Sequence, residues 1–429
     1  MTDNWRKKTL DELVESTLIG LVKNKSEQDD NKAFIYIKMH NITPDNKLDT
    51  SKVVRVDALA EEVEKYKLSE GDFLFNTRNS HELVGKSCIF SMPKMQPILF
   101  NNNIMRIRFT PEVDSKFIAY SFSSQYISEQ LESIKNGTTN VSAIYYSSLK
   151  NVAITYPHLP EQKRIVAILD EAFEGIDRAI ANTEKNLANA RELFENYLNT
   201  IFTQKGDGWE EKKLEDICSI KHGFAFKGEF FTNNPSQYIL LTPGSFHESG
   251  GYREQGEKTK YYVGEVPDTY ILRKGDFLFV MTEQAVGLLG SSLIVPESNR
   301  FLHNQRLGLV EVFNGFEWHN DFFFHQFNTQ GFRAAVQSSA SGVKVRHTSP
   351  KKLGAIKVFF PRTKAEQKAV ADTLNELYAE TQRLEAIYRQ KIAALKELKQ
   401  SILQKAFTGE LTADNANQVK KTAKEINAA

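Results

Sequence analysis

Side chains that can recognise a nucleic acid gather in several short polar segments of this sequence. Arg and Lys bond to guanine edges and to phosphates, and Asn and Gln bond to adenine edges, while tyrosine rings can stack on bases. The segments of this composition contain Arg78, Asn79, Lys135, Tyr145, Tyr146, Lys150, Lys221, His222, Lys227, Thr282, Gln284, Lys344, Arg346, His347, Lys351 and Lys352. We interpret them as candidate nucleic-acid contacts, with the densest basic segment at 344–352.

Each candidate also has a plainer interpretation. The side chains at 78–79 and 282–284 can equally be ordinary solvated loop residues, and both tyrosines at 145–146 can be partly buried. The group at 221–227 is the weakest of the clusters.

The sequence contains no recognisable catalytic motif. Its nine histidines form no His-x-x-x-His or His-Glu-x-x-His arrangement, so a metal site is not expected. No Gly-x-Ser-x-Gly elbow, no phosphate-binding Gly-x-x-x-x-Gly-Lys loop and no Asn-Pro-Pro-aromatic motif is present, and Asn233-Asn234-Pro235-Ser236 does not qualify as the last. We therefore expect no catalytic residue, no metal and no cofactor.

Charge and composition restrict the class of protein. Lys and Arg number 55 against 54 for Asp and Glu, so any phosphate contact must come from a local basic surface. The two cysteines, Cys88 and Cys218, form neither a metal-ligand spacing nor a disulfide framework, which suits a reducing compartment. Because no run approaches the ~18 apolar residues of a membrane span, we expect a cytoplasmic protein without membrane contact.

The sequence contains an internal repeat of about 204 residues. The pentapeptide Gly71-Asp72-Phe73-Leu74-Phe75 recurs as Gly275-Asp276-Phe277-Leu278-Phe279, and Trp5 recurs as Trp209, both displaced by 204 residues. Glu161-Gln162-Lys163 recurs as Glu366-Gln367-Lys368, and Phe202-Thr203 recurs as Phe407-Thr408, displaced by 205. Landmarks in the same order at a near-constant displacement indicate a tandem duplication.

Each copy begins with a mixed globular part. Short apolar runs bounded by turn residues predict strands at 88–90, 104–109 and 152–156, and in the second copy at 293–295, 307–312 and 355–360. Apolar spacing near 3.6 predicts one amphipathic helix over Ser115 to Ile134 and another over Trp318 to Ser338. Pro157 and Pro361 close the two globular parts.

Each copy then continues into a long helix. Apolar-leaning positions recur at spacings of four and three from Leu169 through Tyr197 to Ile201, and again from Leu374 to Ile402, with Lys391 interrupting the second series. This is the pattern of a coiled-coil seam. Two such stripes most simply bury each other within one chain, the alternative being that each packs on its own globular part or on a second chain. We thus predict domains at 1–157 and 204–361, long helices at 158–203 and 362–408, and a flexible tail at 409–429.

The two copies agree in their framework and differ in the polar segments between. Residues 76–81 differ from 280–285, and residues 137–142 differ from 342–347. Two similar scaffolds with different polar loops are expected of two readers of different short targets, whereas a symmetric dimer would read two identical half-sites.

The Gly-Asp-Phe-Leu-Phe segments, the proline followed by Glu-Gln-Lys, and the ending Phe407-Thr408-Gly409-Glu410-Leu411 resemble the specificity (HsdS) subunits of type I restriction–modification systems over essentially the whole chain. The first copy departs from that ending, with Phe202-Thr203-Gln204-Lys205. The resemblance implies an α+β protein in which two tandem mixed α/β target recognition domains are separated by two long helices forming an intramolecular antiparallel coiled coil.

The resemblance also implies a function and partners. Each recognition domain would read one half of a bipartite target on double-stranded DNA, and the helices would act as a spacer and dock two methyltransferase (M) subunits, with restriction (R) subunits joining the full complex. Two alternatives stay open from the residues alone. One is a stand-alone DNA methyltransferase or nuclease with an unrecognised site, and the other is a coiled-coil protein–protein adaptor without a DNA role.

Overall fold

The computed structural model describes residues 5–92, 96–284 and 286–411. The chain forms two compact units, of which unit 1 comprises Met1–Glu184 with Gln390–Ala429 and unit 2 comprises Lys185–Arg389. Each unit therefore combines one globular domain with a part of each long helix. The predicted division at 157, 203 and 361 instead cuts the chain where helices begin and end. The two divisions differ because each helix contributes its two halves to different units.

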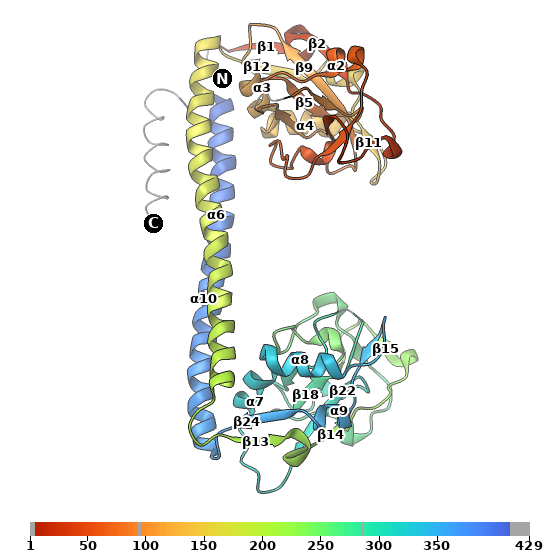
Figure 1. Ribbon diagram of the computed structural model, residues 1–429, viewed down its shortest axis with the longest axis vertical. Coiled ribbons are helices and arrows are strands. Elements are labelled where there is room, and N and C mark those ends of the chain that lie inside the picture. Colours follow the sequence, from red (N-terminus) through yellow and green to blue (C-terminus); the bar gives the residue numbers. More distant parts are fainter. Residues whose placement is uncertain (1–4, 93–95, 285, 412–429) are drawn as a thin grey trace. The chain divides into compact units, whose positions relative to one another are not determined.

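Unit 1 and unit 2 repeat the same principal elements (Figure 1). In unit 1 these are β1 (Arg6–Thr9), α1 (Leu10–Leu13), β2 (Val14–Ile19), β3 (Phe34–Ile37), β4 (Val54–Val56), α2 (Ala60–Tyr66), β5 (Phe73–Asn76), β6 (Arg78–Asn79), β7 (Ser87–Ile89), β8 (Ile98–Phe100), β9 (Ile104–Phe109), α3 (Ser115–Phe122), α4 (Gln125–Ile134), β10 (Asn136–Gly137), β11 (Ser142–Ala143), α5 (Tyr146–Leu149) and β12 (Ala153–Tyr156). In unit 2 they are β13 (Glu210–Lys213), β14 (Cys218–His222), β15 (Phe231–Thr232), β16 (Tyr238–Leu240), β17 (Tyr261–Tyr262), β18 (Phe277–Val280), β19 (Thr282–Glu283), β20 (Ser292–Ile294), β21 (Phe301–Leu302), β22 (Leu307–Val312), α7 (Asn320–Phe327), α8 (Gln330–Ser339), β23 (Arg346–His347), α9 (Pro350–Gly354) and β24 (Lys357–Phe360).

The repeated pentapeptide forms the central strand of each domain. Strand order is β2-β9-β5-β7 in unit 1 and β14-β22-β18-β20 in unit 2, all antiparallel. Successive side chains of a strand point to opposite faces, so Phe73 and Phe75 enter the core beneath α3 and α4 while Leu74 enters a second core beside β3 and β8. Gly71 takes a φ of 85°, and the Asp72 carboxylate accepts a bond from the Ser69 amide at 2.8 Å. The motif is thus a strand buried on both faces with its starting turn.

Both predicted amphipathic helices are wrong as single helices. Each is two helices, α3 and α4 in unit 1 and α7 and α8 in unit 2. The hydroxyl of Ser124 accepts a bond from the Ile127 amide, and the Thr329 hydroxyl does the same for Phe332. These side chains cap a new helix, which the apolar periodicity does not reveal because it continues across the break.

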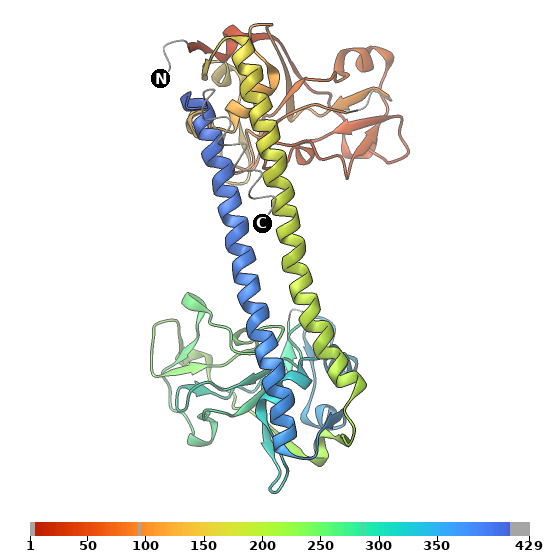
Figure 2. The ribbon, with the colours of Figure 1, turned by 90° about the vertical axis from the view of Figure 1, so that its left-hand side faces the viewer.

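The long helices are α6 (Leu159–Gln204) and α10 (Lys364–Thr408), close to their predicted bounds. Figure 2 shows them side by side, and their contacts within unit 2 join Arg191 to Glu385 at 2.9 Å and Phe194 to Tyr378 at a ring distance of 5.2 Å. Residue numbers rise on α6 as they fall on α10, so the pair is antiparallel. Tyr197 is 41% exposed, whereas Leu198 is 5% exposed, so the buried stripe departs here from the predicted seam.

The end of each helix packs into the domain of the other copy. Phe407, at the end of α10, lies 5.2 Å from Phe117 in unit 1. Its counterpart Phe202, at the end of α6, lies 5.3 Å from Phe322 in unit 2. This exchange explains why the Phe-Thr landmark closes both copies.

One glutamine amide joins each helix to its own domain. Gln162, which is 0% exposed, accepts a bond from the Asp114 amide at 2.8 Å and donates to the carbonyls of Glu112 and Pro157. Gln367, its counterpart, is also 0% exposed and repeats this pattern with His319, Glu317 and Pro361. The repeated Glu-Gln-Lys segment therefore marks a structural junction.

The predicted tail starts too early. Leu411 is 3% exposed and belongs to the core of unit 1, so the chain still packs against the domain at this residue. The rest of the predicted tail, 412–429, lies outside the described residues. Among the described helices, none combines the length and apolar composition that a membrane crossing requires.

Replacing Gln162 by alanine should destabilise unit 1. The substitution leaves the Asp114 amide and two backbone carbonyls without their partner, and a buried polar group left unpaired costs about 1–3 kcal/mol. We expect a loss of about 2–4 kcal/mol in the free energy of unfolding, measured by urea denaturation. The neighbouring exposed Lys163→Ala is the control and should change the free energy by less than about 0.5 kcal/mol; an equal effect of both changes would contradict the role of the amide.

Candidate nucleic-acid interface

Several candidate residues meet in a short strand ladder within each unit. In unit 1, β6 pairs with β11 and β11 pairs with β10, which aligns Arg78, Ala143 and Asn136 across three strands. In unit 2, β19 pairs with β23, and a further bridge joins Ser341 to His347, which aligns Thr282, His347 and Ser341. We call these two aligned sets the outer rows. The adjacent pairs, Asn79 with Ser142 and Glu283 with Arg346, are the inner rows.

A glycine turns the hairpin that completes each ladder. Gly137 and Gly342 follow Asn136 and Ser341 and have φ values of 133° and 98°. A Cβ atom on Gly342 would lie 2.0 Å from the carbonyl oxygen of Val345, and one on Gly137 would lie 2.3 Å from that of Val141. Both positions therefore require glycine.

The inner-row candidates are held by the protein itself. Arg346 lies 3.5 Å from the Glu283 carboxylate and donates to the Gln337 carbonyl at 2.8 Å. Glu283 is 2% exposed and also accepts bonds from the amides of Gly287 and Leu289. Asn79 bonds to Asn76 and to the Ser80 amide. These side chains brace the ladder, although the sequence marked Arg346 and Asn79 as contacts.

Other candidates are also engaged. The Lys135 ammonium donates to the His81 carbonyl and pairs with Glu132 at 2.7 Å. The Tyr146 hydroxyl donates to Asp11 at 2.8 Å, and burial together with this bond raises the pKa of Tyr146 to about 12. Partial burial, the plainer interpretation of this tyrosine, therefore describes Tyr146, whereas Tyr145 is 53% exposed.

The remaining candidates form two groups, those with a side-chain hydrogen bond among the described residues and those without one. His347 and Lys352 both approach the hydroxyl of Ser341 at 3.3 Å. The side chains without a hydrogen bond or ion pair in that part of the chain are Arg78, Tyr145, Lys150, His222, Thr282, Gln284, Lys344 and Lys351. Of these, Arg78, Lys344 and Lys351 are exposed cations that remain available to a ligand.

The structure brings only two of the three candidates at 221–227 together. Lys221 and His222 are the last two residues of β14. His222 lies opposite Gly308, which lies opposite Phe279 near the end of β18, so both residues lie at the end of the sheet where β18 leads into β19. Lys221 lies 4.0 Å from Glu311 and 5.4 Å from the ring of Tyr270. Lys227 lies beyond the strand and pairs with Glu229 at 3.9 Å.

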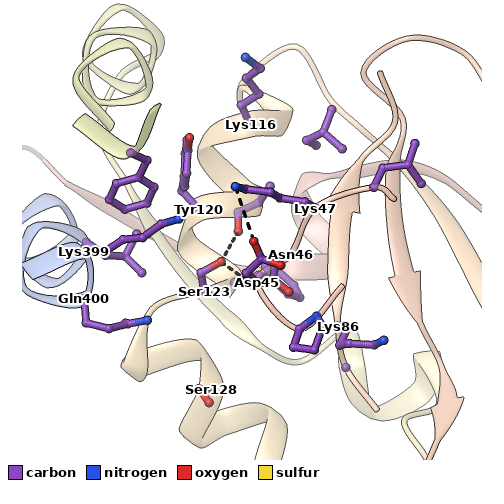
Figure 3. A pocket seen from close by; sticks show the side chains of 18 of the residues that line it. Asp45, Asn46, Lys47, Lys86, Lys116, Tyr120, Ser123, Ser128, Lys399 and Gln400 are labelled. Atoms are coloured by element: carbon purple, nitrogen blue, oxygen red, sulfur yellow. Dashed lines mark hydrogen bonds and ion pairs between the residues drawn. The ribbon is translucent and has the colours of Figure 1, made fainter. Parts of the chain in front are cut away.

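A separate groove of about 1360 Å³ lies within unit 1, where the loop at 44–48 and helices α3 and α4 face α6 and α10 (Figure 3). Three of its lysines are paired with aspartates of α6. Asp177 accepts bonds from Lys399 and Lys47, and these bonds hold the pKa of Asp177 below its usual value although burial alone would raise it. Lys116 pairs with Asp170 at 3.0 Å. Because Lys47, Lys116 and Lys399 are each paired with an aspartate of α6, we assign this groove to domain–helix packing.

Sequence inspection missed three kinds of residue in the ladders. Asn136 and Ser341 complete the outer rows, and Glu283 holds the inner row of the second ladder through Arg346. Each of these residues is separated by tens of residues from some of its partners. Val343, at the tip of the second hairpin, is 98% exposed. The repeated glycine of each hairpin, at 137 and 342, was the available signal that residues on both sides of it are paired.

Replacing Gly342 by alanine should open the second hairpin. The φ of 98° and the overlap with the Val345 carbonyl oxygen require the backbone to move, at a cost of about 1–3 kcal/mol. Hydrogen exchange of the mutually bonded amides of Ser341 and His347 should then become faster by roughly tenfold to a hundredfold. The control is Gly331→Ala on α8, where a Cβ atom meets nothing within 4 Å, and protection equal in both variants would contradict the strain.

Acid should destabilise unit 2 through His303. This residue is 0% exposed and its Nε2–H donates to the Leu307 carbonyl, and burial lowers the pKa of His303 to about 4. The unfolded chain binds a proton near pH 6.5 while the folded chain does not, so stability present above pH 6.5 declines as the pH falls toward 4. The loss is of the order of 3 kcal/mol at most.

His303→Phe should remove that part of the pH dependence, since the equivalent position in unit 1 is the buried Phe100. Urea denaturation between pH 4 and 7 measures it, with the exposed His247→Phe as control. A variant that keeps the full acid sensitivity would show that other groups cause it.

Comparisons with known proteins agree with the duplicated architecture. The family model described as "Type I restriction modification DNA specificity domain" matches twice, over residues 2–188 and 206–395. Among curated relatives, the EcoBI specificity subunit of Escherichia coli is 27% identical over 54% of this chain, and the match spans 46% of that relative's length. A putative MjaX specificity subunit of Methanocaldococcus jannaschii is 23% identical over 95% of this chain and 94% of its own.

Solved structures share the fold. A chain from a structure titled as the basis of complex assembly and conformational transition of the type I R-M system has a TM-score of 0.73 and 18% identity, over 95% of this chain and 98% of that one. The HsdS subunit of Thermoanaerobacter tengcongensis has a TM-score of 0.57 and 18% identity, over 96% and 98%. With a matching domain in each copy, this chain belongs to the family of type I restriction–modification DNA specificity subunits.

Proposed function

We propose that this chain reads an asymmetric, two-part sequence on double-stranded DNA, with one part read by each globular domain. The observation that carries this proposal is the pair of ladders. They have the same strand pairing and the same hairpin glycine but different side chains in the outer rows. Identical half-sites would need identical readers, and Arg78 in one row stands where Thr282 stands in the other.

Local cations supply the phosphate contacts in this proposal. Lys150, Lys344 and Lys351 lie next to the ladders in sequence and have no hydrogen bond or ion pair among the described residues. Phosphate contacts position a protein on the duplex, whereas base-edge contacts specify the sequence. The near-zero net charge of the chain is compatible with this division, because phosphate contacts need a local group of cations, such as Lys344, Lys351 and Lys352, and not a basic average.

The long helices are the proposed docking surface for two methyltransferase subunits, which in turn bring restriction subunits. Within unit 2, both helices keep apolar side chains exposed, with Leu193 66% exposed, Tyr197 41% exposed and Ile387 45% exposed. One of the structural relatives comes from work on assembly of the type I system. In this proposal the chain supplies sequence recognition, and the partner subunits supply methylation and cleavage.

Methylome sequencing of cells with and without this chain tests the proposal directly. We expect one bipartite motif, with two different halves and a fixed spacer, that disappears when the chain is removed. A motif with two identical halves, or an unchanged methylome, would contradict the asymmetric reader.

Binding of the purified partner-bound complex to the two-part duplex provides the second measurement. Scrambling either half should lower affinity, and the logarithm of the binding constant should fall linearly with the logarithm of the salt concentration. Unchanged affinity after scrambling one half would contradict the proposal. The chain alone, incubated with DNA, Mg²⁺ and S-adenosylmethionine, is the control, and turnover by it would favour a stand-alone enzyme.

A further inference from the structure

The two rows of each ladder differ in what surrounds them. Residues directly opposite each other on antiparallel strands project to the same side, and their neighbours along the strand project to the other side. In the outer rows, Arg78, Asn136, Ser341 and His347 are exposed, whereas Ala143, the middle member of the first row, is 7% exposed. Arg78 has no hydrogen bond or ion pair among the described residues. In the inner rows, Ser142 is 1% exposed and Glu283 is 2% exposed.

The inner rows are tied to the body of each domain. Glu283 holds two backbone amides at 287 and 289 and pairs with Arg346, which in turn donates to the end of α8 at Gln337. The Ser142 hydroxyl donates to the Thr138 carbonyl across the hairpin at 2.8 Å. Substituting these groups would therefore disturb the ladder itself.

The outer row also has suitable dimensions for a base-pair edge. Neighbouring strands lie ~4.8 Å apart, so three aligned side chains span ~10 Å. The major groove of B-form DNA is ~12 Å wide and admits a two-stranded ribbon. The ~10 Å span of the outer row is therefore small enough for the ladder to enter this groove with the polar side chains of that row toward the bases.

Building on the proposed function, we infer that the outer row of each ladder determines the bases that its domain reads, and that the inner row only positions it. The guanidinium of Arg78 is the donor for the O6 and N7 acceptors of a guanine in the half-site of the first domain. In the second domain the His347 ring, held at 3.3 Å from the Ser341 hydroxyl, takes the corresponding place from the opposite strand of its ladder. Arg346 and Asn79 are positioning residues.

Single substitutions in the full chain, assembled with its partner subunits, test the assignment. With Arg78→Ala, we expect methylome sequencing to show relaxed selectivity at one base pair of one half-site, where guanine was required, and an unchanged second half-site. Discrimination at that base pair should fall by roughly tenfold to a hundredfold. His347→Ala should relax one base pair of the other half-site only.

Two matched variants separate base reading from general weakening. Lys150→Ala, which removes a half-buried cation on the same domain as Arg78, should lower occupancy of all sites alike and reduce the salt dependence while the motif stays the same. Arg346→Gln should lower the melting temperature of unit 2 and leave every base of the motif unchanged. Arg78→Ala should keep the wild-type melting temperature because its side chain is exposed.

The inference is overturned if Arg78→Ala weakens all sites equally with no base pair relaxed, or if Arg346→Gln changes which base is required. Both results leave the proposed two-part reader intact, provided that the unaltered chain still directs a bipartite motif. Absence of such a motif with the unaltered chain would instead contradict the proposed function.

Discussion

A buried side-chain amide fixes the direction in which each long helix leaves its own domain. Gln162 and Gln367 each satisfy one backbone donor and two backbone acceptors at the point where the last strand ends and the helix begins. A carboxylate could accept but not donate, and an apolar side chain could do neither, so few other residues fit this place. The ladders are connected to the helices through the domain that this amide anchors.

The domain–helix contacts just beyond these amides use different chemistry in the two copies. In unit 1, Asp170 on α6 accepts from the Tyr120 hydroxyl at 2.6 Å and from Lys116 at 3.0 Å. In unit 2, Asn375 on α10 accepts at 2.7 Å from His325 and donates at 3.2 Å to Asp321.

These equivalent positions are not interchangeable. The second domain placed on α6 would bring Asp321 against Asp170, and two carboxylates without a cation repel each other. Each domain is thereby matched to its own helix, although the two frameworks have the same strand order. The exchanged helix ends, where Phe407 meets Phe117 and Phe202 meets Phe322, have in contrast kept the same residue type.

The sequence predicted the features that repeat along the chain and missed those that depend on distant partners. The duplication, the short strands and both long helices follow from repeats and spacing in the sequence, and the structure has them at nearly the predicted residues. The helix breaks at Ser124 and Thr329 were missed because a hydroxyl cap leaves apolar periodicity intact. Arg346 was marked as a contact because its charge is visible in the sequence, while the Glu283 that pairs with it lies 63 residues away.

The same structure explains how the two domains could diverge in the ladders without losing their fold. Phe73, Phe75 and their counterparts are fully or almost fully buried, so changes there alter the packing of the core beneath the helices of each domain. The outer rows lie past the ends of these strands, and Arg78 or His347 can change without creating a cavity. What the ladder itself requires is the hairpin glycine, and that residue is the same in both copies. The side chains of the outer rows can therefore vary independently of the stability of the fold.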